Sequence, residues 1–197
     1  TSAPFETSQR TATAALPGAG LTRGTVHAMD PRACMPENGR ARQTRNRRPS
    51  MKIEATITAP DSIEELAAHA RELDRLGYDS LLVPEAGHDP FLSQMILAEH
   101  TRRARIGTGI AISFPRSPFV TAQLAWDLQR FSRGRFVLGL GTQVRAHNER
   151  RYSTPWPSPP GPRLREYILC VKAIHEHFRT GAKPDFRGQH YQFTLSN

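Results

Sequence analysis

From residue 51 onward, short apolar runs alternate with longer amphipathic segments, and this alternation constrains the fold more than any other feature. The apolar runs predict strands that start near residues 51, 79, 105 and 135, each followed by a segment with helical periodicity. Strand and helix in strict alternation imply a parallel sheet with helical crossovers. Two architectures remain open on this pattern, a doubly wound open sheet and an eight-stranded barrel.

Capping signals mark several helix boundaries. Ser62 and Glu65 have the spacing of a capping box, and Gly77 ends the same segment. Ser117 precedes a proline, as is typical of a helix start, and Gly134 ends that helix. The predicted strands are 51–57, 79–84, 105–113 and 135–141. The predicted helices run from the cap at 61–62 to 77, over 90–100, from 117 to 134 and over 164–179. A short extended piece is expected at 188–193.

Residues 1–50 have no apolar periodicity. They hold eight arginines against three acidic residues, which is more than half of the net charge of +9. A stretch of this composition buries too little apolar surface to offset its ordering entropy. We therefore expect a disordered basic N-terminal extension at 1–50, followed by one folded domain at 51–197. A nucleic-acid arm and a targeting peptide are the alternatives, and nucleic acid is the less favoured partner.

Composition also bears on the compartment and on metals. No apolar run approaches the ~18 residues of a membrane helix, so no membrane association is expected. Cys34 and Cys170 lie far apart, which argues against a disulfide framework and favours a cytoplasmic location. His175 and His177 point to different faces of a predicted helix. We predict that this histidine pair is solvated and that the chain holds no metal site.

Glycines follow two of the predicted strands, at 107–109 and 139–141. Neither motif has the third glycine of a dinucleotide fingerprint, since Val144 occupies that position in the second, and no Walker loop occurs. Two explanations remain open. The glycines let a flat ligand approach the backbone at the strand ends, where such folds bind ligands, or they relieve crowding inside a narrow sheet.

Several segments resemble, in order and in spacing, motifs of the luciferase-like monooxygenase family of flavin and deazaflavin oxidoreductases. They read GTGIAISFPRSP at 107–118, WDLQRFSRGRF at 126–136 and VLGLGT at 137–142. The segments PEAGHDPF at 84–91 and QVRAHNER at 143–150 are similar to a subgroup of deazaflavin (coenzyme F420) enzymes. The resemblance runs from about residue 51 to residue 193.

The resemblance implies an α/β fold of the (β/α)8 TIM-barrel type with parallel strands, of which this chain holds about four βα units, the N-terminal half. A complete barrel takes about 250 residues, so we expect the domain at 51–197 to be incomplete and marginally stable or homo-oligomeric. The resemblance also implies FMN or coenzyme F420 at the carboxyl ends of the strands, and a non-prolyl cis peptide in a bulge near Gly109–Ile110.

The candidate catalytic residues follow the second predicted strand. His88 is expected to hydrogen-bond substrate or to stabilise a reduced ring, and Glu85 to act as a general acid or base. The alternatives are a histidine that caps local backbone and a helix-cap carboxylate. Arg116 either meets an anionic tail or pairs on the surface. The residues that the resemblance places at the cofactor are Gly109, Ile110, Ala111, Gly141, Thr142, Gln143 and His147. For His147 the alternative is a place in an ordinary polar loop.

The sequence therefore predicts a luciferase-like oxidoreductase or monooxygenase that uses FMN or F420 on a small organic substrate. A truncated half-barrel without activity is the main alternative, and a nucleic-acid binder that acts through its basic arm is less favoured. Trp156 stands among prolines and forms either a lid wall or a stiff loop.

Overall fold

A parallel sheet organises the part of the chain that this computed structural model describes, residues 51–58, 62–157 and 159–196. Four strands pair in the order β1-β2-β3-β5. Leu81 of β2 lies beside Ala55 of β1 and Ile106 of β3, and every pairing in this sheet is parallel. The strands are β1 (Glu54–Thr56), β2 (Ser80–Val83), β3 (Arg105–Thr108) and β5 (Phe136–Val137). The expected parallel α/β architecture is confirmed.

The third and fourth predicted strands are each interrupted, which corrects the prediction of single strands over 105–113 and 135–141. After the interruption, β4 (Ala111–Ile112) pairs in parallel with β6 (Leu140–Gly141). Before it, Gly107 pairs with Val137, and after it Ala111 pairs with Leu140. Residues 108–110 thus stand opposite residues 138–139, so the third strand carries one extra residue. This is a β-bulge.

A side chain maintains the pairing inside the bulge. Thr108 Oγ1 donates to Gly139 O at 2.7 Å and accepts from Gly139 N at 2.9 Å. Gly139 O also accepts from Ala111 N at 2.8 Å, so it is the Gly139 N–H that depends on the Thr108 hydroxyl for its partner. The alternating apolar pattern does not reveal this exchange, because a threonine fits an unbroken strand equally well.

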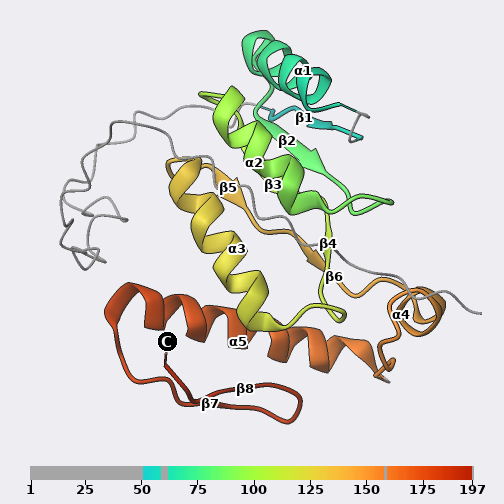
Figure 1. Cartoon of the computed structure of the whole chain (residues 1–197), viewed down its shortest axis with the longest axis vertical. Helices are drawn as coiled ribbons and strands as arrows, with labels where there is room; N and C mark the ends of the chain where they lie inside the picture. Colours follow the sequence, from blue (N-terminus) through green and yellow to red (C-terminus); the bar gives the residue numbers. More distant parts are fainter. Residues whose placement is uncertain (1–50, 59–61, 158, 197) are drawn as a thin grey trace, which may run out of the picture. The chain divides into compact units, whose positions relative to one another are not determined.

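The first three helices begin and end close to the capping signals. In α1 (Ile63–Leu76), Ser62 Oγ accepts from Glu65 N at 3.0 Å, and Gly77 ends the helix at a φ of 93°. Ser117 Oγ likewise accepts from Val120 N at 3.2 Å. The other two helices are α2 (Pro90–His100) and α3 (Pro118–Phe131). Figure 1 shows α2 and α3 lying across one face of the sheet.

The last part of the chain differs more from prediction. A short helix, α4 (Arg145–Arg150), stands where a polar loop was the simpler expectation. The following helix, α5 (Pro160–Thr180), begins earlier than predicted and ends at Gly181, which has a φ of 71°. The extended piece predicted at 188–193 is part of an antiparallel hairpin made by β7 (Phe186–Arg187) and β8 (Gln192–Phe193).

Two apolar cores join these layers. Leu81, Val83 and Ile106 of the sheet are almost fully buried in a first core shared with α1, α2 and α3. A second core joins α3, α5 and the hairpin, and its buried members are Ala122, Tyr167, Cys170, Val171, Ile174 and Phe193. Each large apolar side chain that is buried contributes roughly 1.5–3 kcal/mol. The helix α5 and the hairpin are therefore anchored chiefly on α3.

A polar contact ties α5 to the start of α3 within the second core. The Tyr167 hydroxyl lies 2.5 Å from Thr121 Oγ1 and donates to Ser117 O at 3.3 Å. Burial raises the pKa of Tyr167 to about 12, although the hydrogen bond with Thr121 opposes that shift. Burial also raises the pKa of the free Cys170 thiol to about 11, so this thiol stays protonated at neutral pH.

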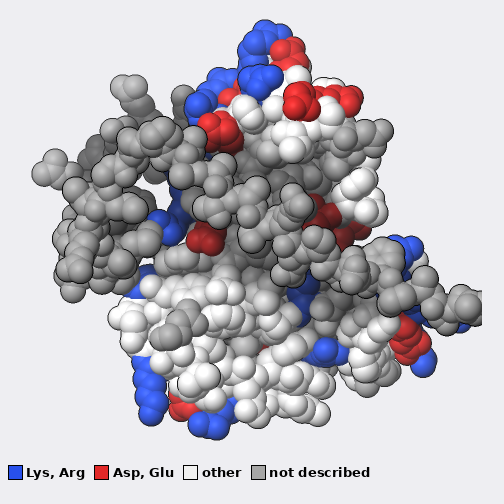
Figure 2. Space-filling view, viewed as in Figure 1, with Lys and Arg blue, Asp and Glu red and all other residues white. Residues whose placement is uncertain are grey.

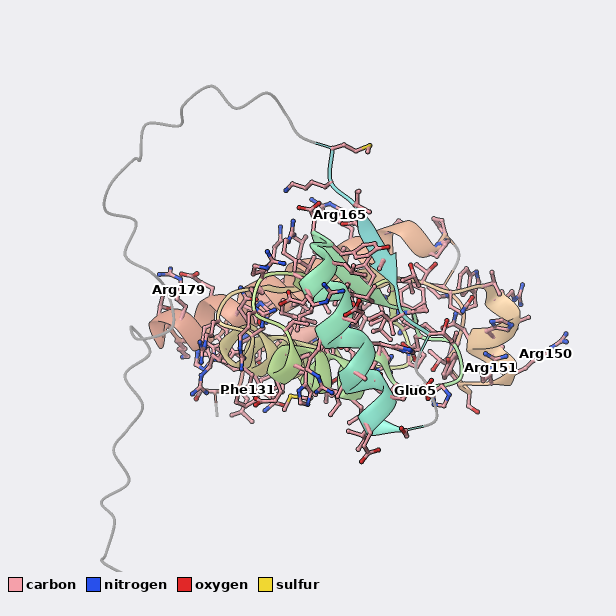
Figure 3. The ribbon with its side chains drawn as sticks, turned by 90° about the horizontal axis from the view of Figure 1, so that it is seen from above. Glu65, Phe131, Arg150, Arg151, Arg165 and Arg179 are labelled. Atoms are coloured by element: carbon pink, nitrogen blue, oxygen red, sulfur yellow. The ribbon has the colours of Figure 1, made fainter. Side chains whose placement is uncertain are left out.

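Charged side chains gather unevenly on the surface. Figure 2 shows basic and acidic groups together over α1 and a largely uncharged region over the lower elements of the same view. Figure 3 shows Arg150 and Arg151 projecting from the α4 end and Arg179 at the opposite end. Among the described residues, no helix combines the length and apolar character needed to span a bilayer. The extension expected at 1–50 lies outside the described residues.

Asp74, near the end of α1, holds the turn that leads into β3. Its carboxylate accepts from the backbone N–H groups of Arg102 at 2.9 Å, Arg103 at 3.0 Å and Ala104 at 2.7 Å. Burial raises the pKa of Asp74, but the three N–H groups and the charge of Arg103 outweigh burial, so its pKa is lowered. The ionised form is therefore the one that stabilises the fold.

We predict that Asp74→Asn lowers the free energy of unfolding by about 1–3 kcal/mol at pH 7, the usual worth of hydrogen bonds to a charged group. Because the folded pKa is lowered, this stabilisation is present above the unfolded pKa of about 3.9 and is lost as the pH falls through the folded value. Urea denaturation should show that the difference in the free energy of unfolding between wild type and variant disappears below about pH 4. Glu72→Gln, which breaks an exposed pair with Arg75 on the same helix, is the control and should change little. A gap that stays constant with pH would contradict the role given to Asp74.

Candidate functional site

The carboxyl ends of the second, third and fourth strands meet at one edge of the sheet. Glu85 N donates to Ile110 O at 3.2 Å and so joins the end of β2 to the third strand. Ser113 N donates to Gly141 O at 2.9 Å and joins the third strand to the fourth. The structure therefore brings together the site residues that the sequence placed after these three strands. Parallel pairing requires this outcome, since all strands then end on the same side.

Ile110 presents an apolar surface at this edge. Its peptide bond with Gly109 is cis, as the resemblance implied. The residue is 38% exposed and lies over Gly141, where an added Cβ would come within 2.7 Å of Ile110 Cδ1. Ala111, another residue expected at the cofactor, is buried in the first core. Its side chain therefore serves packing, and only its backbone remains for a ligand.

Contacts within the protein account for three of the strand glycines, which agrees with the second of the two explanations left open by the sequence, the relief of crowding. A Cβ on Gly107 would lie 2.7 Å from Val137 O, and one on Gly139 would collide with Thr108 O. Backbone atoms cannot retreat, so crowding in the sheet accounts for these two glycines. At Gly141 the nearest atoms belong to the flexible end of Ile110. This glycine instead allows the Ile110 side chain to lie flat across the strand end.

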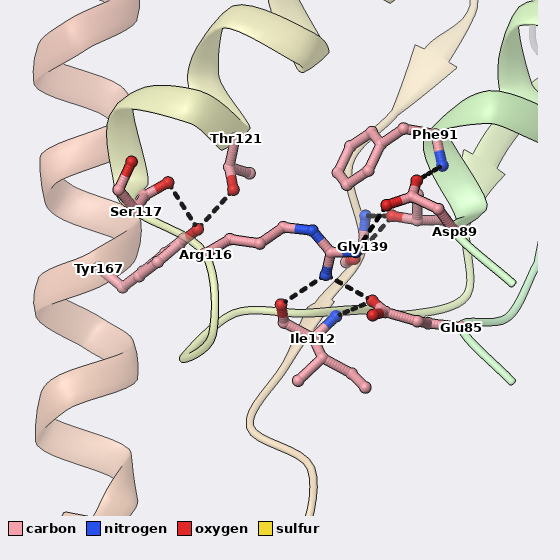
Figure 4. Close-up of polar contacts among 10 residues, drawn as sticks. Glu85, Asp89, Phe91, Ile112, Arg116, Ser117, Thr121, Gly139 and Tyr167 are labelled. Atoms are coloured by element: carbon pink, nitrogen blue, oxygen red, sulfur yellow. Dashed lines mark hydrogen bonds and ion pairs between the residues drawn. The ribbon is translucent and has the colours of Figure 1, made fainter. Parts of the chain in front are cut away.

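A guanidinium joins two acidic residues beside the third strand (Figure 4). Arg116 Nη1 lies 2.7 Å from Glu85 Oε2, and Arg116 Nη2 lies 2.9 Å from Asp89 Oδ2. Glu85 Oε2 also accepts from Ile112 N at 2.7 Å, and Arg116 Nη1 donates to Ile112 O at 3.0 Å. The exposed fractions of the side chains are 18% for Arg116 and 8% for Glu85. Arg116 thus pairs within the molecule, in a mostly buried setting and not on the open surface.

The two acids outweigh the effect of burial on this guanidinium. Burial lowers the pKa of Arg116, but the hydrogen bonds and charges of Glu85 and Asp89 outweigh burial, and the pKa is raised overall. Glu85 in turn is engaged with a cation and with a backbone N–H. In this position the Glu85 carboxylate holds the backbone of Ile112. To act as a general acid or base, Glu85 would have to give up its contacts with Ile112 and Arg116.

His88 lies in an exposed stretch between the two acids. Gly87 before it adopts a φ of 88°, in the left-handed region. The His88 ring makes no hydrogen bond with any residue in the described ranges. The helix cap here is Asp89, whose Oδ1 accepts from Phe91 N at 2.8 Å. The alternative in which His88 caps local backbone is therefore not observed.

The end of the fourth strand turns directly into α4. Gln143 has a φ of 60°, and its Oε1 accepts from Val144 N at 2.9 Å. Thr142 Oγ1 donates to Gln143 O at 3.0 Å. Asn148, buried in α4, donates from Nδ2 to Thr142 O at 2.8 Å. The residues expected here as cofactor contacts thus form a compact turn closed by Asn148, and His147 lies half-buried beside it.

Three buried polar atoms around this turn lack a hydrogen-bond partner among the described residues. They are Ser113 Oγ, His147 Nδ1 and Asn148 Oδ1. Ser113 bonds through its backbone to Gly141, and Asn148 bonds through its amide to Thr142, so the unpaired atoms flank one strand end. Buried polar atoms are normally paired. Unmet donors and acceptors beside an exposed apolar surface suit a ligand that has a flat ring and polar substituents.

An aromatic wall stands after the third strand. The Arg163 guanidinium lies 4.7 Å from the centre of the Phe114 ring and 5.4 Å from that of Tyr191. Its Nε donates to Tyr191 Oη at 2.9 Å. Trp156 packs edge-on against Phe114 at 5.9 Å. Phe114 and Tyr191 therefore both contact the Arg163 cation. Trp156 contacts Phe114, and its segment is thus fixed to the connection between β4 and α3.

The prediction that His175 and His177 are solvated is wrong, since both side chains are partly buried. His175 is half-buried and donates from Nε2 to Ala122 O at 3.0 Å. Burial lowers its pKa more than this bond raises it. His177 Nδ1 lies 2.6 Å from Ala182 O. Both rings pack in the aromatic cluster around Phe178, which the helical pattern alone does not show. Within the described ranges, no cluster of metal-ligating side chains occurs.

A family model described as luciferase-like monooxygenase matches residues 40–197. Among curated proteins, an uncharacterised protein of Mycobacterium tuberculosis is 43% identical over 141 residues, which cover 72% of this chain and 41% of the relative. The F420-dependent glucose-6-phosphate dehydrogenase of Intrasporangium calvum is 31% identical over 144 residues, which cover 65% of this chain and 42% of the relative. The chain therefore spans less than half the length of these relatives.

Solved structures share the fold at low sequence identity. The oxygenating constituent of 3,6-diketocamphane monooxygenase from Pseudomonas putida, in complex with FMN, superposes with a TM-score of 0.61 at 16% identity, over 75% of this chain and 45% of that one. The coenzyme F420-dependent tetrahydromethanopterin reductase of Methanopyrus kandleri gives 0.59 at 18% identity, over 72% and 44%. With the parallel βα units, these likenesses confirm the expected fold class, a parallel α/β fold of the (β/α)8-barrel type, and the chain covers less than half of each of these two solved structures.

The sequence did not indicate Ser113 or the partners of Arg116 at this edge. Ser113 was not singled out, because a serine at a strand end carries no signal of its own. Arg116 was noted, but its partners Glu85 and Asp89 are 31 and 27 residues away in sequence. The only usable signal was an excess of acids in the connection after the second strand.

We predict that Arg116→Met lowers the free energy of unfolding by about 3 kcal/mol, because it leaves the buried Glu85 carboxylate without its cation. Arg75→Met, which opens the exposed pair with Glu72, should change the free energy of unfolding little. Adding Glu85→Leu to Arg116→Met should recover part of the loss. Urea denaturation of the four proteins measures each value. Equal, small losses for Arg116→Met and Arg75→Met would show that the pair is not structurally important.

Proposed function

The chain belongs to the luciferase-like monooxygenase family, and from that premise we propose that its strand-end edge holds a flavin-type ring, FMN or coenzyme F420, for oxidoreductase chemistry on a small organic substrate. The observation that carries this proposal is the bulge at residues 108–110. It leaves the Ile110 side chain exposed over Gly141, beside buried polar atoms that have no partner among the described residues. Relatives with each cofactor support the cofactor class and leave the choice between the two open.

The protein groups fall into two sets around such a ring. The backbone of Gly109 to Ala111 and the Ile110 side chain form the surface behind it, as an apolar face suits a planar ring. The turn of Thr142 and Gln143, together with His147, supplies polar groups next to that surface. When bound, the cofactor supplies the redox chemistry, and the protein orients it and shields it from water.

His88 is the residue that we assign to proton transfer or hydrogen bonding at the reacting centre. It is exposed at the same edge, its ring has no partner among the described residues, and imidazole can donate and accept near neutral pH. Glu85, which the sequence also marked as catalytic, we assign to holding the backbone of the third strand, since both its contacts are structural.

A second candidate is a half-barrel that binds no cofactor. The observation that favours it is the open sheet, since among the described strands β1 and β5 each pair on one side only. The edge strands β1 and β5 would then have to meet other protein, and self-association stays a prediction. A cytoplasmic location likewise stays a prediction.

Fluorescence titration with FMN and with F420 tests the proposal. We expect the wild-type chain to quench the fluorescence of one of the two cofactors. Gly141→Val should weaken that binding about tenfold or more, because overpacking moves Ile110 and costs roughly 1–3 kcal/mol. Gly161→Ala is the control, because an added Cβ there meets nothing within 4 Å. No quenching of either cofactor by the wild-type chain would overturn the proposal and support the half-barrel without cofactor.

A further inference from the structure

One guanidinium holds both ends of the stretch that carries His88. Glu85 precedes this stretch and Asp89 follows it, and Arg116 reaches the first through Nη1 at 2.7 Å and the second through Nη2 at 2.9 Å (Figure 4). Between them, Ala86, Gly87 and His88 are all exposed. The position of His88 is therefore set from its two flanks, through Arg116.

The same guanidinium also fixes the strand behind the proposed ring. Arg116 Nη1 donates to Ile112 O at 3.0 Å, while Glu85 Oε2 accepts from Ile112 N at 2.7 Å. Both backbone groups of Ile112 are thus held by the ion pair, two residues after Ile110. Asp89, the third member, caps α2 through Phe91 N, and the Phe91 ring lies 5.5 Å from the guanidinium carbon.

The geometry requires a planar, forked cation. Three acceptors, on Glu85, Asp89 and Ile112, are reached by two nitrogens of one group. A lysine ammonium keeps the charge but is a compact point charge without the fixed fork, so it cannot meet all three in the same arrangement. The 18% exposure of Arg116 limits replacement of these contacts by water.

We propose that Arg116 is a positioning residue, which sets His88 against the Gly109–Ile112 segment without touching cofactor or substrate. This inference rests on the proposed function, because it concerns how two walls of the same site are held in relation to one another. It assigns to Arg116 a role in ligand binding that acts through His88, in addition to its contribution to stability.

We call the contacts of Arg116 with Glu85, Asp89 and Ile112 the clamp. The clamp is tested first, without cofactor, by hydrogen exchange on the full chain. Arg116→Lys should speed exchange of the Ile112 and Phe91 amides about tenfold or more, because their acceptors on Glu85 and Asp89 are released. The Glu65 amide, bonded to Ser62 Oγ at the remote end of α1, is the internal control and should not change. Unchanged exchange at Ile112 and Phe91, or equal acceleration at Glu65, would overturn the clamp.

A double-mutant cycle then tests the action through His88. Wild type, Arg116→Lys, His88→Asn and the double variant are titrated anaerobically with reduced FMN and with reduced F420, and melting temperatures are recorded. Each single change should weaken binding about tenfold, and the double variant should bind no more weakly than His88→Asn alone. An effect of Arg116 on binding that does not act through His88 would make the two losses multiply.

The two proposals fail in different ways. If the wild-type chain binds a cofactor and Arg116→Lys binds it equally well, or if the losses multiply, the positioning role is overturned and the proposed function stands. If the wild-type chain binds neither cofactor in either redox state, the proposed function falls and the positioning role falls with it, whatever the exchange experiment shows of the clamp.

Discussion

One extra residue in the third strand is the constraint on which the candidate site depends. Residues 108–110 stand opposite residues 138–139, and regular parallel pairing resumes on both sides. Side chains alternate between the faces of a strand, so one added residue changes which face each following side chain occupies. Ala111 thereby joins the first core, while Ile110 is left exposed at the strand ends. Thr108 keeps the backbone of Gly139 paired, and the sheet continues despite the bulge.

Charge and packing then fix the surroundings of that bulge. Arg116, Glu85 and Asp89 join the connection after β2 to β4 on one side. On the other side, Arg163 and its aromatic neighbours hold the Trp156 segment. The second core binds α5 and the hairpin to α3, so the Tyr191 ring stacked on Arg163 is itself anchored. The exposed edge thus rests on two separately stabilised supports.

The sequence predicts the parallel βα order and most helix boundaries well because their causes are local. Ser62, Ser117 and Gly77 act within one turn of the helices they delimit, and the structure shows their caps. The apolar pattern does not show the interruptions of the strands, since the contact of Thr108 with Gly139 joins residues 31 apart in sequence, and only the resemblance implied a bulge near Gly109–Ile110. The helix α4 was missed because its six residues, RAHNER, have no apolar face.

The site shows the same division between local and distant causes. Residues 85, 110 and 141 were placed together correctly, because parallel strands end on one side. The role of Glu85 was not predictable, since a carboxylate after a strand reads equally as an acid, a base or half of an ion pair. The cis bond at Gly109–Ile110 was expected only from the resemblance, and no periodic pattern indicates it.

The proposed function requires a planar redox ring to lie on Ile110. Methyl NMR of the chain with isoleucine δ1 methyl labels measures this directly, because an aromatic ring shifts the resonance of a methyl group that it covers. On addition of FMN or F420, we expect a large upfield shift of the Ile110 methyl resonance and none for the buried Ile106 and Ile174. An unmoved Ile110 resonance in the presence of bound cofactor would contradict it.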